Sequence, residues 1–257
     1  MIDCNAYLSH WPFRRVPLDE PASLLRRMDV LSIEKACVGS FDALLHRDVE
    51  AVNARLARTI AENDPERFHG FGCVNPALPD WQEDLRRCVE QHGMVGIRLH
   101  PAYHGYLLDD PRMAQLLRMS SERNIPVQIV LKMEDERTQH PLLRVPYTPP
   151  RPLISVLQQI SGCRIMLLNA LRDLRGGDLE QIVNETPVLL DIAMLEGIGG
   201  IENLIRKVPP QRIVWGTFAP LFAPESAVGK MRESSLGQRL TRQITIENCR
   251  KFLEPLP

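Results

Sequence analysis

The feature that most constrains the fold is an eightfold alternation of short apolar runs with helix-forming segments. Each run has 5–7 residues, most are rich in Val and Ile, and Gly, Pro, Asn or Asp lies close to its ends. Runs of this length and composition are typical of buried parallel strands. The runs are Ile2–Ala6, Ala36–Phe41, Phe68–Val74, Val95–His100, Val127–Lys132, Arg164–Asn169, Val188–Ile192 and Ile213–Thr217.

Amphipathic segments separate the runs, with apolar residues recurring every three or four positions, as on one face of a helix. These segments are Asp48–Glu62, Asp80–Gln91, Pro111–Arg123, Pro152–Ile160, Asp178–Glu185, Gly200–Lys207, Glu225–Arg232 and the terminal Thr241–Leu253. Eight β-α units predict a single (β/α)8 TIM barrel, with one domain over residues 1–257. A doubly wound open sheet is the alternative, but it usually carries a Gly-rich phosphate turn after an early strand, and the sequence has none.

Composition narrows the classes of partner. The 257 residues carry a formal net charge of -1, which does not favour nucleic acid or an anionic membrane as a partner. No apolar run reaches the roughly 18 residues of a membrane span, and the N-terminus lacks the pattern of a signal peptide. The six cysteines form no C-x-x-C pair. We therefore expect a cytoplasmic protein with reduced thiols and a small-molecule ligand; whether it forms a homodimer is left open.

Polar residues at the ends of the runs predict a ligand site. In a barrel of this kind the site lies at the C-terminal ends of the strands. If Ile97 and Leu99 pack outward, Arg98 and His100 face the lumen. The same alternation gives a predicted ring of polar groups at the mouth, formed by Asn5, Tyr7, Arg98, His100, Lys132, Asn169 and Asp191. Barrel interiors are otherwise filled by branched apolar side chains, so this ring indicates a binding site.

Structural roles compete with this interpretation. Arg98 and Asp191 can form a buried ion pair that only fills the barrel, and His100 can cap a loop. The irregular segment Glu134–Arg151 follows the fifth run, so we expect a loop on the active face that acts as a lid. The charged residues where this segment begins are open to two interpretations. They form either a solvated loop or a site in which Lys132 and Glu134 make a desolvated pair that exchanges protons.

Several stretches resemble one family in the expected order. They are IDCNAY at the start, GIRLHPAYHGYLLDDP (96–111), IPVQIVL (125–131), RIMLLNAL (164–171), VWGTFAP (214–220) and ITIENCRKFL (244–253). Together they resemble the amidohydrolase-2 branch of the amidohydrolase superfamily, whose members are metal-dependent TIM-barrel hydrolases and decarboxylases. The resemblance runs from the first predicted strand to the last predicted helix.

The resemblance implies a centre that holds Zn²⁺ or another divalent ion through His-x-His on the first strand, a His on the fifth and sixth strands, and an Asp on the eighth. In this chain those positions hold Asn5 and Tyr7, Val130 or Lys132, Asn169, and Phe218. We therefore predict that the chain has no metal ligands at these positions and no metal cofactor. A relocated zinc site is the alternative, although Pro101 makes it unexpected that His100 and His104 share one face of a helix.

The resemblance and the polar ring together predict a hydrolase or lyase for a small anionic metabolite. The predicted catalytic residues are His100, Asp191 and Glu134. The predicted substrate-binding residues are Asn5, Tyr7, Arg98, Lys132 and Asn169. The alternative is a catalytically degenerate barrel that binds a small molecule or a protein partner.

Overall fold

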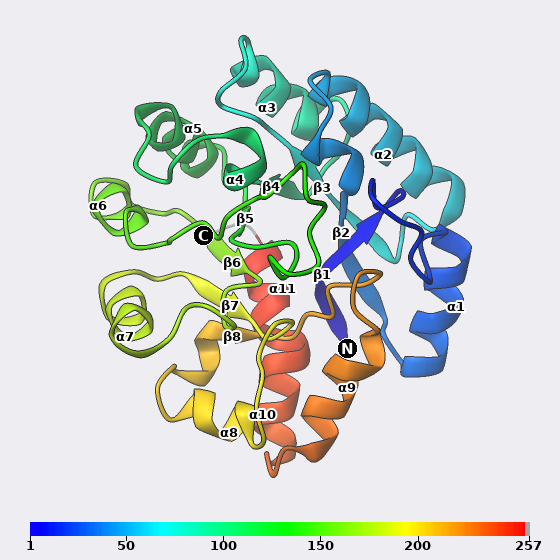
Figure 1. Ribbon diagram of the computed structural model, residues 1–257, viewed down its shortest axis with the longest axis vertical. Coiled ribbons are helices and arrows are strands. Elements are labelled where there is room, and N and C mark those ends of the chain that lie inside the picture. The colour runs from blue at the N-terminus through cyan, green and yellow to red at the C-terminus, as the bar shows by residue number, and fades with distance from the viewer. Residues whose placement is uncertain (255–257) are drawn as a thin grey trace.

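Eight parallel strands form the centre of the protein in this computed structural model, which describes residues 1–254 (Figure 1). They follow one another in chain order around the sheet. Their bounds are β1 Ile2–Leu8, β2 Lys35–Ser40, β3 Phe68–Cys73, β4 Gly96–Leu99, β5 Val127–Val130, β6 Ile165–Leu168, β7 Leu189–Asp191 and β8 Ile213–Val214. Each strand overlaps one predicted run, so the eightfold alternation correctly located all eight strands.

The sheet closes between its first and last strands. The Cys4 N–H donates to the Trp215 carbonyl over 3.1 Å, and the Tyr7 N–H donates to the Ala219 carbonyl over 2.8 Å. In return the Phe218 N–H donates to the Asn5 carbonyl over 2.7 Å. The predicted (β/α)8 barrel is therefore confirmed, because a closed parallel sheet leaves no edge strand unpaired.

Helices surround the strands (Figure 1). Their bounds are α1 Pro21–Leu31, η1 Phe41–Leu44, α2 Val49–Asn63, α3 Trp81–Glu90, α4 Pro101–His104, α5 Pro111–Glu122, α6 Leu153–Leu157, α7 Gly176–Glu185, α8 Gly200–Ile205, η2 Pro210–Arg212, α9 Pro224–Glu233, α10 Gln238–Arg242, η3 Gln243–Glu247 and α11 Asn248–Leu253. The predicted terminal helix is broken into α10, one π-turn at η3, and α11. None of the helices in residues 1–254 has the length and apolar character needed to cross a membrane.

Two helices escaped the sequence prediction. Helix α1 buries Leu24, Met28 and Leu31 at helical spacing, a signal that was present in the sequence. Helix α4 is a single turn, too short to show any periodicity. Its formation corrects the expectation drawn from Pro101, because proline is favourable at the first position of a helix and disruptive only further in.

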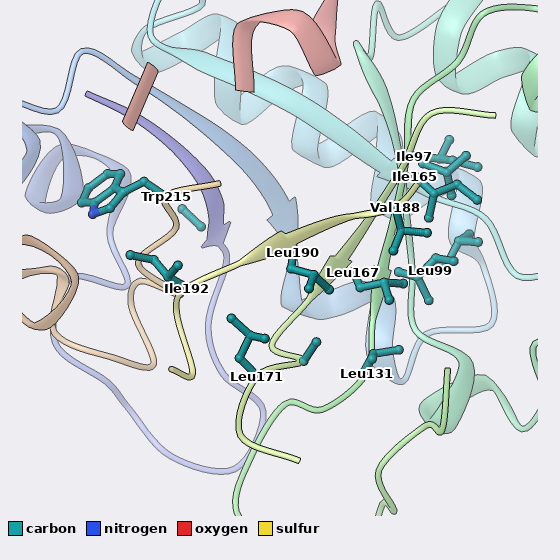
Figure 2. Packing of buried hydrophobic residues seen from close by; sticks show 14 of the residues in the cluster. Ile97, Leu99, Leu131, Ile165, Leu167, Leu171, Val188, Leu190, Ile192 and Trp215 are labelled. Carbon is teal, nitrogen blue, oxygen red and sulfur yellow. The ribbon is translucent and has the colours of Figure 1, made fainter. Parts of the chain in front are cut away.

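The hydrophobic interior has two layers, separated by the strands. Figure 2 shows part of the outer layer, which includes Ile97 and Leu99 of β4 and Ile165 and Leu167 of β6. Inward-facing side chains, among them Cys4, Val130 and Met166, form a second cluster. Because Ile97 and Leu99 pack outward, Arg98 between them points inward, as alternation along a strand requires.

Candidate functional site

Polar side chains gather where the strands end, and nearly all of them are buried. Arg98, Asn5, Asn169 and Asp191 are fully buried, while Lys132 keeps 9 % of its surface exposed. The structure therefore brings the predicted ring to the interior and the mouth of the barrel. Whether the ring binds a substrate remains a prediction, since burial also suits a structural network.

Arg98 does not pair with Asp191, which corrects the predicted structural ion pair. Its guanidinium donates to the Ala6 carbonyl over 2.6 Å, to the Cys37 carbonyl over 3.0 Å and to Gln128 Oε1 over 2.8 Å. The guanidinium carbon also lies 4.5 Å from the centre of the Tyr7 ring. With these partners Arg98 ties β1, β2 and β5 together, and each of its three guanidinium nitrogens donates one hydrogen bond within the barrel.

Asp191 instead belongs to an amide network with Asn5 and Asn169. Asn5 Nδ2 donates to Asp191 Oδ2 over 2.7 Å and to Asn169 Oδ1 over 2.8 Å. The Asn169 N–H donates to Asp191 Oδ1 over 2.8 Å. Burial raises the pKa of Asp191 to about 6, although these hydrogen bonds oppose the rise.

Two of the positions at which the resemblance expects metal ligands thus lie in this network. The amide NH2 of Asn5 stands between two acceptor oxygens, where a cation would otherwise bridge them. Phe218 follows β8 with a φ of 61°, its N–H bound to the Asn5 carbonyl, and its ring has no ligand atom. This donor set does not fit the divalent ion that the resemblance implies for these positions.

Lys132 and Glu134 do not pair, which corrects the predicted proton-exchanging pair. Lys132 Nζ lies 3.1 Å from Asp173 Oδ2, and Glu134 Oε1 lies 2.5 Å from an Arg14 guanidinium nitrogen. Sequence spacing alone could not foresee these partners, because Arg14 and Asp173 come from loops after other strands. Glu134 thus fastens the segment after β5 to the loop after β1.

The segment 134–151 covers the mouth as the sequence predicted for a loop, without helix or strand before α6 (Figure 1). Beneath it lies a small pocket lined by His100, Tyr103, Lys132, Met133, Val145 and Pro146, among others. Its volume is about 10 Å³, which is room for about one water molecule. In this arrangement the pocket is too small for a substrate, so binding would require the segment to move.

His100 occupies the turn from β4 into α4, a place that Pro101 and Gly105 define. Pro101 starts the helix, and Gly105 ends it with a φ of 71°. The single turn between them places the ring of His104 5.9 Å from that of His100. His100 Nε2 lies 3.1 Å from the Tyr7 hydroxyl. Burial holds the pKa of His100 well below its usual range, so the imidazole is neutral.

Cys73, at the end of β3, completes a group that the sequence analysis did not assemble. Its Sγ lies 3.8 Å from His100 Nδ1. Cys73, His100 and His104 each offer one ligand atom, and the three atoms lie within 4.8 Å of one another. The signal was present in the sequence, since Cys73 and His100 end neighbouring parallel strands.

Solved structures similar to this chain include several decarboxylases. The 2,6-dihydroxybenzoate decarboxylase from Rhizobium has a TM-score of 0.77 at 16% identity, covering 98% of each chain. The dihydroxybenzoic acid decarboxylase from Polaromonas sp. JS666, with bound manganese and the inhibitor 2-nitroresorcinol, has a TM-score of 0.76 at 13% identity, covering 98% of this chain and 96% of that one. The 5-carboxyvanillate decarboxylase from Sphingomonas paucimobilis has a TM-score of 0.74 at 12% identity, covering 100% of this chain and 99% of that one.

These findings contradict the prediction that the protein has no metal cofactor. Similar barrels contain manganese, and this chain brings Cys73, His100 and His104 together as potential metal ligands. The prediction rested on the positions at which the resemblance expects ligands, and the relocated zinc site that was left as the alternative did not include Cys73. Thiol and imidazole groups fit a divalent ion of zinc type, and such an ion polarises carbonyl groups or activates water.

A family comparison agrees with the resemblance seen in the motifs. No curated protein sequence matches the chain. The amidohydrolase family matches residues 12–153, more than half of the sequence. The chain therefore belongs to the amidohydrolase family.

Proposed function

We propose that this protein is a hydrolase or lyase that acts on a small anionic metabolite at the barrel mouth. The observation that carries the proposal is the closed pocket under the segment 134–151, where His100, Tyr103 and Lys132 meet an apolar wall that includes Val130 and Met133. A pocket with one cation, apolar walls and a few polar groups suits a small organic anion.

Lys132 is the proposed anchor for the anionic group. Its ammonium group is held by Asp173 at 3.1 Å, and its side chain is only 8% exposed. A substrate carboxylate would replace Asp173 as its partner when the covering segment opens. This role agrees with the predicted one, whereas the engaged guanidinium of Arg98 supports a positioning role for that residue.

His100 and Tyr7 are the proposed proton-transferring pair. Their hydrogen bond of 3.1 Å joins an imidazole in the wall of the pocket to a buried phenol. Hydrolysis needs a group that takes a proton from water, and decarboxylation needs one that delivers a proton to carbon. Either step can use this pair. Asp191 acts here as a positioning residue, because it holds Asn169, whose Nδ2 donates to the Lys132 carbonyl over 2.8 Å.

Aromatic carboxylates are the first substrate class to test. Tyr103 contributes an aromatic ring to the pocket walls, beside the apolar side chains of Val130 and Val145. The similar structures include decarboxylases named for dihydroxybenzoate and carboxyvanillate. A flat ring with a carboxylate would match these walls and the ammonium group of Lys132.

The experiment is a turnover screen of small carboxylates, with the metal-supplemented protein and product detection by mass spectrometry. With a substrate in hand, Lys132→Met should raise KM by about tenfold or more with little change in kcat, because it removes a binding contact. His100→Gln should lower kcat by about 100-fold or more. The control Lys251→Met changes an exposed lysine of α11 and should change neither value. Full activity in both pocket variants would contradict the proposal.

A binding module is the second candidate, and the closed mouth favours it. A pocket with room for about one water molecule admits no substrate without movement of its cover. In that case a metabolite that raises the melting temperature should remain unchanged after long incubation with the protein. Turnover of any such ligand would exclude this candidate.

A further inference from the structure

Neighbouring strand ends bring three side chains with metal-ligating atoms to one point beside the mouth. Cys73 ends β3, His100 follows β4, and His104 ends the single turn of α4. None of them occupies a position at which the resemblance expects a metal ligand. A second group, His10 with Asp19 and Glu20, is different, because Arg15 already donates to both of its carboxylates.

Hydrogen bonds indicate which ring nitrogen of each histidine has a lone pair available for a metal ion. His104 Nε2 lies 2.8 Å from the Ala43 carbonyl, so this nitrogen carries the proton and donates it. His104 Nδ1 then presents a lone pair. For His100, the tautomer that suits a metal is the one in which Nε2 donates to the Tyr7 hydroxyl at 3.1 Å, while the hydroxyl proton points to Met133 Sδ at 3.7 Å. His100 Nδ1 therefore also presents a lone pair, toward Cys73 Sγ at 3.8 Å.

Two buried polar atoms at this cluster lack a partner within the described part of the chain. They are His104 Nδ1 and the Tyr106 hydroxyl. The Tyr106 ring centre lies 6.4 Å from that of His104. Buried polar atoms are nearly always hydrogen bonded, and an exception indicates a water or an ion at that place. Acceptor nitrogens beside a thiol favour a cation.

The spacing of the cluster suits zinc. Zinc bonds of about 2.0–2.3 Å in a tetrahedron keep sulfur and nitrogen ligands roughly 3.5 Å apart. The Cys73 Sγ to His100 Nδ1 distance of 3.8 Å is already close to this value, and all three atoms lie within 4.8 Å. Metal-bound histidines usually donate their other N–H to a carbonyl or a similar group, as His104 does to Ala43.

We propose that Cys73, His100 and His104 form a three-ligand zinc site, bound through Sγ and the two Nδ1 atoms. Three protein ligands leave the fourth tetrahedral position for an external ligand, as in catalytic zinc sites. Binding replaces the thiol proton of Cys73 with the metal and releases that proton to solvent. The inference shares His100 with the proposed function and otherwise goes beyond it: with zinc on Nδ1, His100 keeps its Nε2–H for the Tyr7 hydroxyl and orients it, so that Tyr7 is the member of the pair that exchanges a proton with the substrate.

Metal content of the purified protein tests the site without any activity assay. After loading with Zn²⁺ and dialysis, the wild type should retain about one zinc per chain. Cys73→Ser and His104→Gln should each weaken zinc binding by about tenfold or more. Gln at position 104 can still donate to the Ala43 carbonyl, so this variant removes the ligand and keeps the contact. The matched controls Cys163→Ser and His92→Gln should bind zinc as the wild type does.

The absorption spectrum of the cobalt-loaded protein gives a second test. In the wild type, Co²⁺ bound at this site should show a thiolate-to-cobalt absorption band, and Cys73→Ser should abolish it. Folded wild type that retains no zinc and shows no such band would overturn the proposal. Zinc that persists in both Cys73→Ser and His104→Gln would also overturn it, as would a preference for manganese over zinc, which would place the ion on oxygen ligands. Neither result touches the turnover test of the proposed function.

Discussion

The two sides of the barrel mouth differ in how completely their polar atoms are satisfied. On the side of β1, β6 and β7, the Asn5 amide group donates to both Asn169 and Asp191, and among the side-chain atoms of these three residues only Asn5 Oδ1 lacks a partner within residues 1–254. On the side of β3 and β4, two imidazole nitrogens and a thiol face one another, with no donor between them except the thiol proton. The first side is organised as a structural network. The second holds the three side chains of the proposed zinc site.

The proposed zinc site implies that metal ligands can move to other strand ends within the same kind of barrel. The strand ends of a closed barrel converge on one face, so ligands from any neighbouring pair of strands can meet there. The positions that the resemblance assigns to a metal hold amides, a phenol and a phenyl ring here. Cys73, His100 and His104, at the ends of β3 and β4, lie at the same mouth, and their thiol and imidazole groups are softer ligands than carboxylates or amides.

Removal of the central amide should produce the largest change in stability. Asn5→Ala should lower the free energy of unfolding by about 2–4 kcal/mol, because it leaves buried oxygens of Asp191 and Asn169 without a donor. Urea titration in metal-free buffer measures this loss. In the same buffer His104→Gln should cost less than about 1 kcal/mol. An equal or larger loss in His104→Gln would remove the distinction between the two sides.

The pH dependence of stability should identify Asp191 as a carboxyl that is costly to ionise. Its folded-state pKa of about 6 lies above the ordinary 3.8, so its stabilising contribution is present at low pH and is lost as the pH rises through 6. Relative to Asp191→Asn, the wild type should lose about 2 kcal/mol of unfolding free energy between pH 4.5 and pH 8.

The comparison with Asp191→Asn is needed because other buried groups oppose this trend. Burial lowers the pKa of His69, His100 and His104, so their contribution to stability falls as the pH drops below 6.5. Asp3, whose pKa burial raises to about 6, acts in the same direction as Asp191. The variant keeps all of these groups, so the difference isolates Asp191. A difference that stays constant across this pH range would show that Asp191 is ionised without cost.

The smallest predicted effect on stability concerns the segment 134–151, which covers the pocket. Arg14→Gln removes the partner of Glu134, whose side chain is 5% exposed while that of Arg14 is 49% exposed. The loss in stability should be about 1 kcal/mol or less, since one member of the pair lies largely in solvent. Hydrogen exchange should become faster at the amides of residues 134–148, the segment that covers His100 and Lys132. The control Arg86→Gln breaks a helix-surface pair with Glu83 and should leave that segment unchanged.

The fold followed from local patterns, whereas the site required pairings that those patterns do not contain. Each apolar run became a strand, because a strand buried on both faces must be apolar wherever it lies in the chain. Asp173 and Arg14 became the partners of Lys132 and Glu134 only after folding brought separate loops together. Sequence proximity had suggested instead that Lys132 and Glu134 would pair with each other.

The sequence by itself predicted the eight strands, the barrel that they form, most of the helices around it, and the set of polar residues that the strand ends carry. Hydrophobic periodicity is a local property, and it decides secondary structure and burial. Only the tertiary structure decided that Asn5 would join Asn169 and Asp191, and that Cys73 would face His100 and His104. Hydrogen bonds and metal ligation depend on distances of a few ångströms between distant parts of the chain, and strand packing sets those distances.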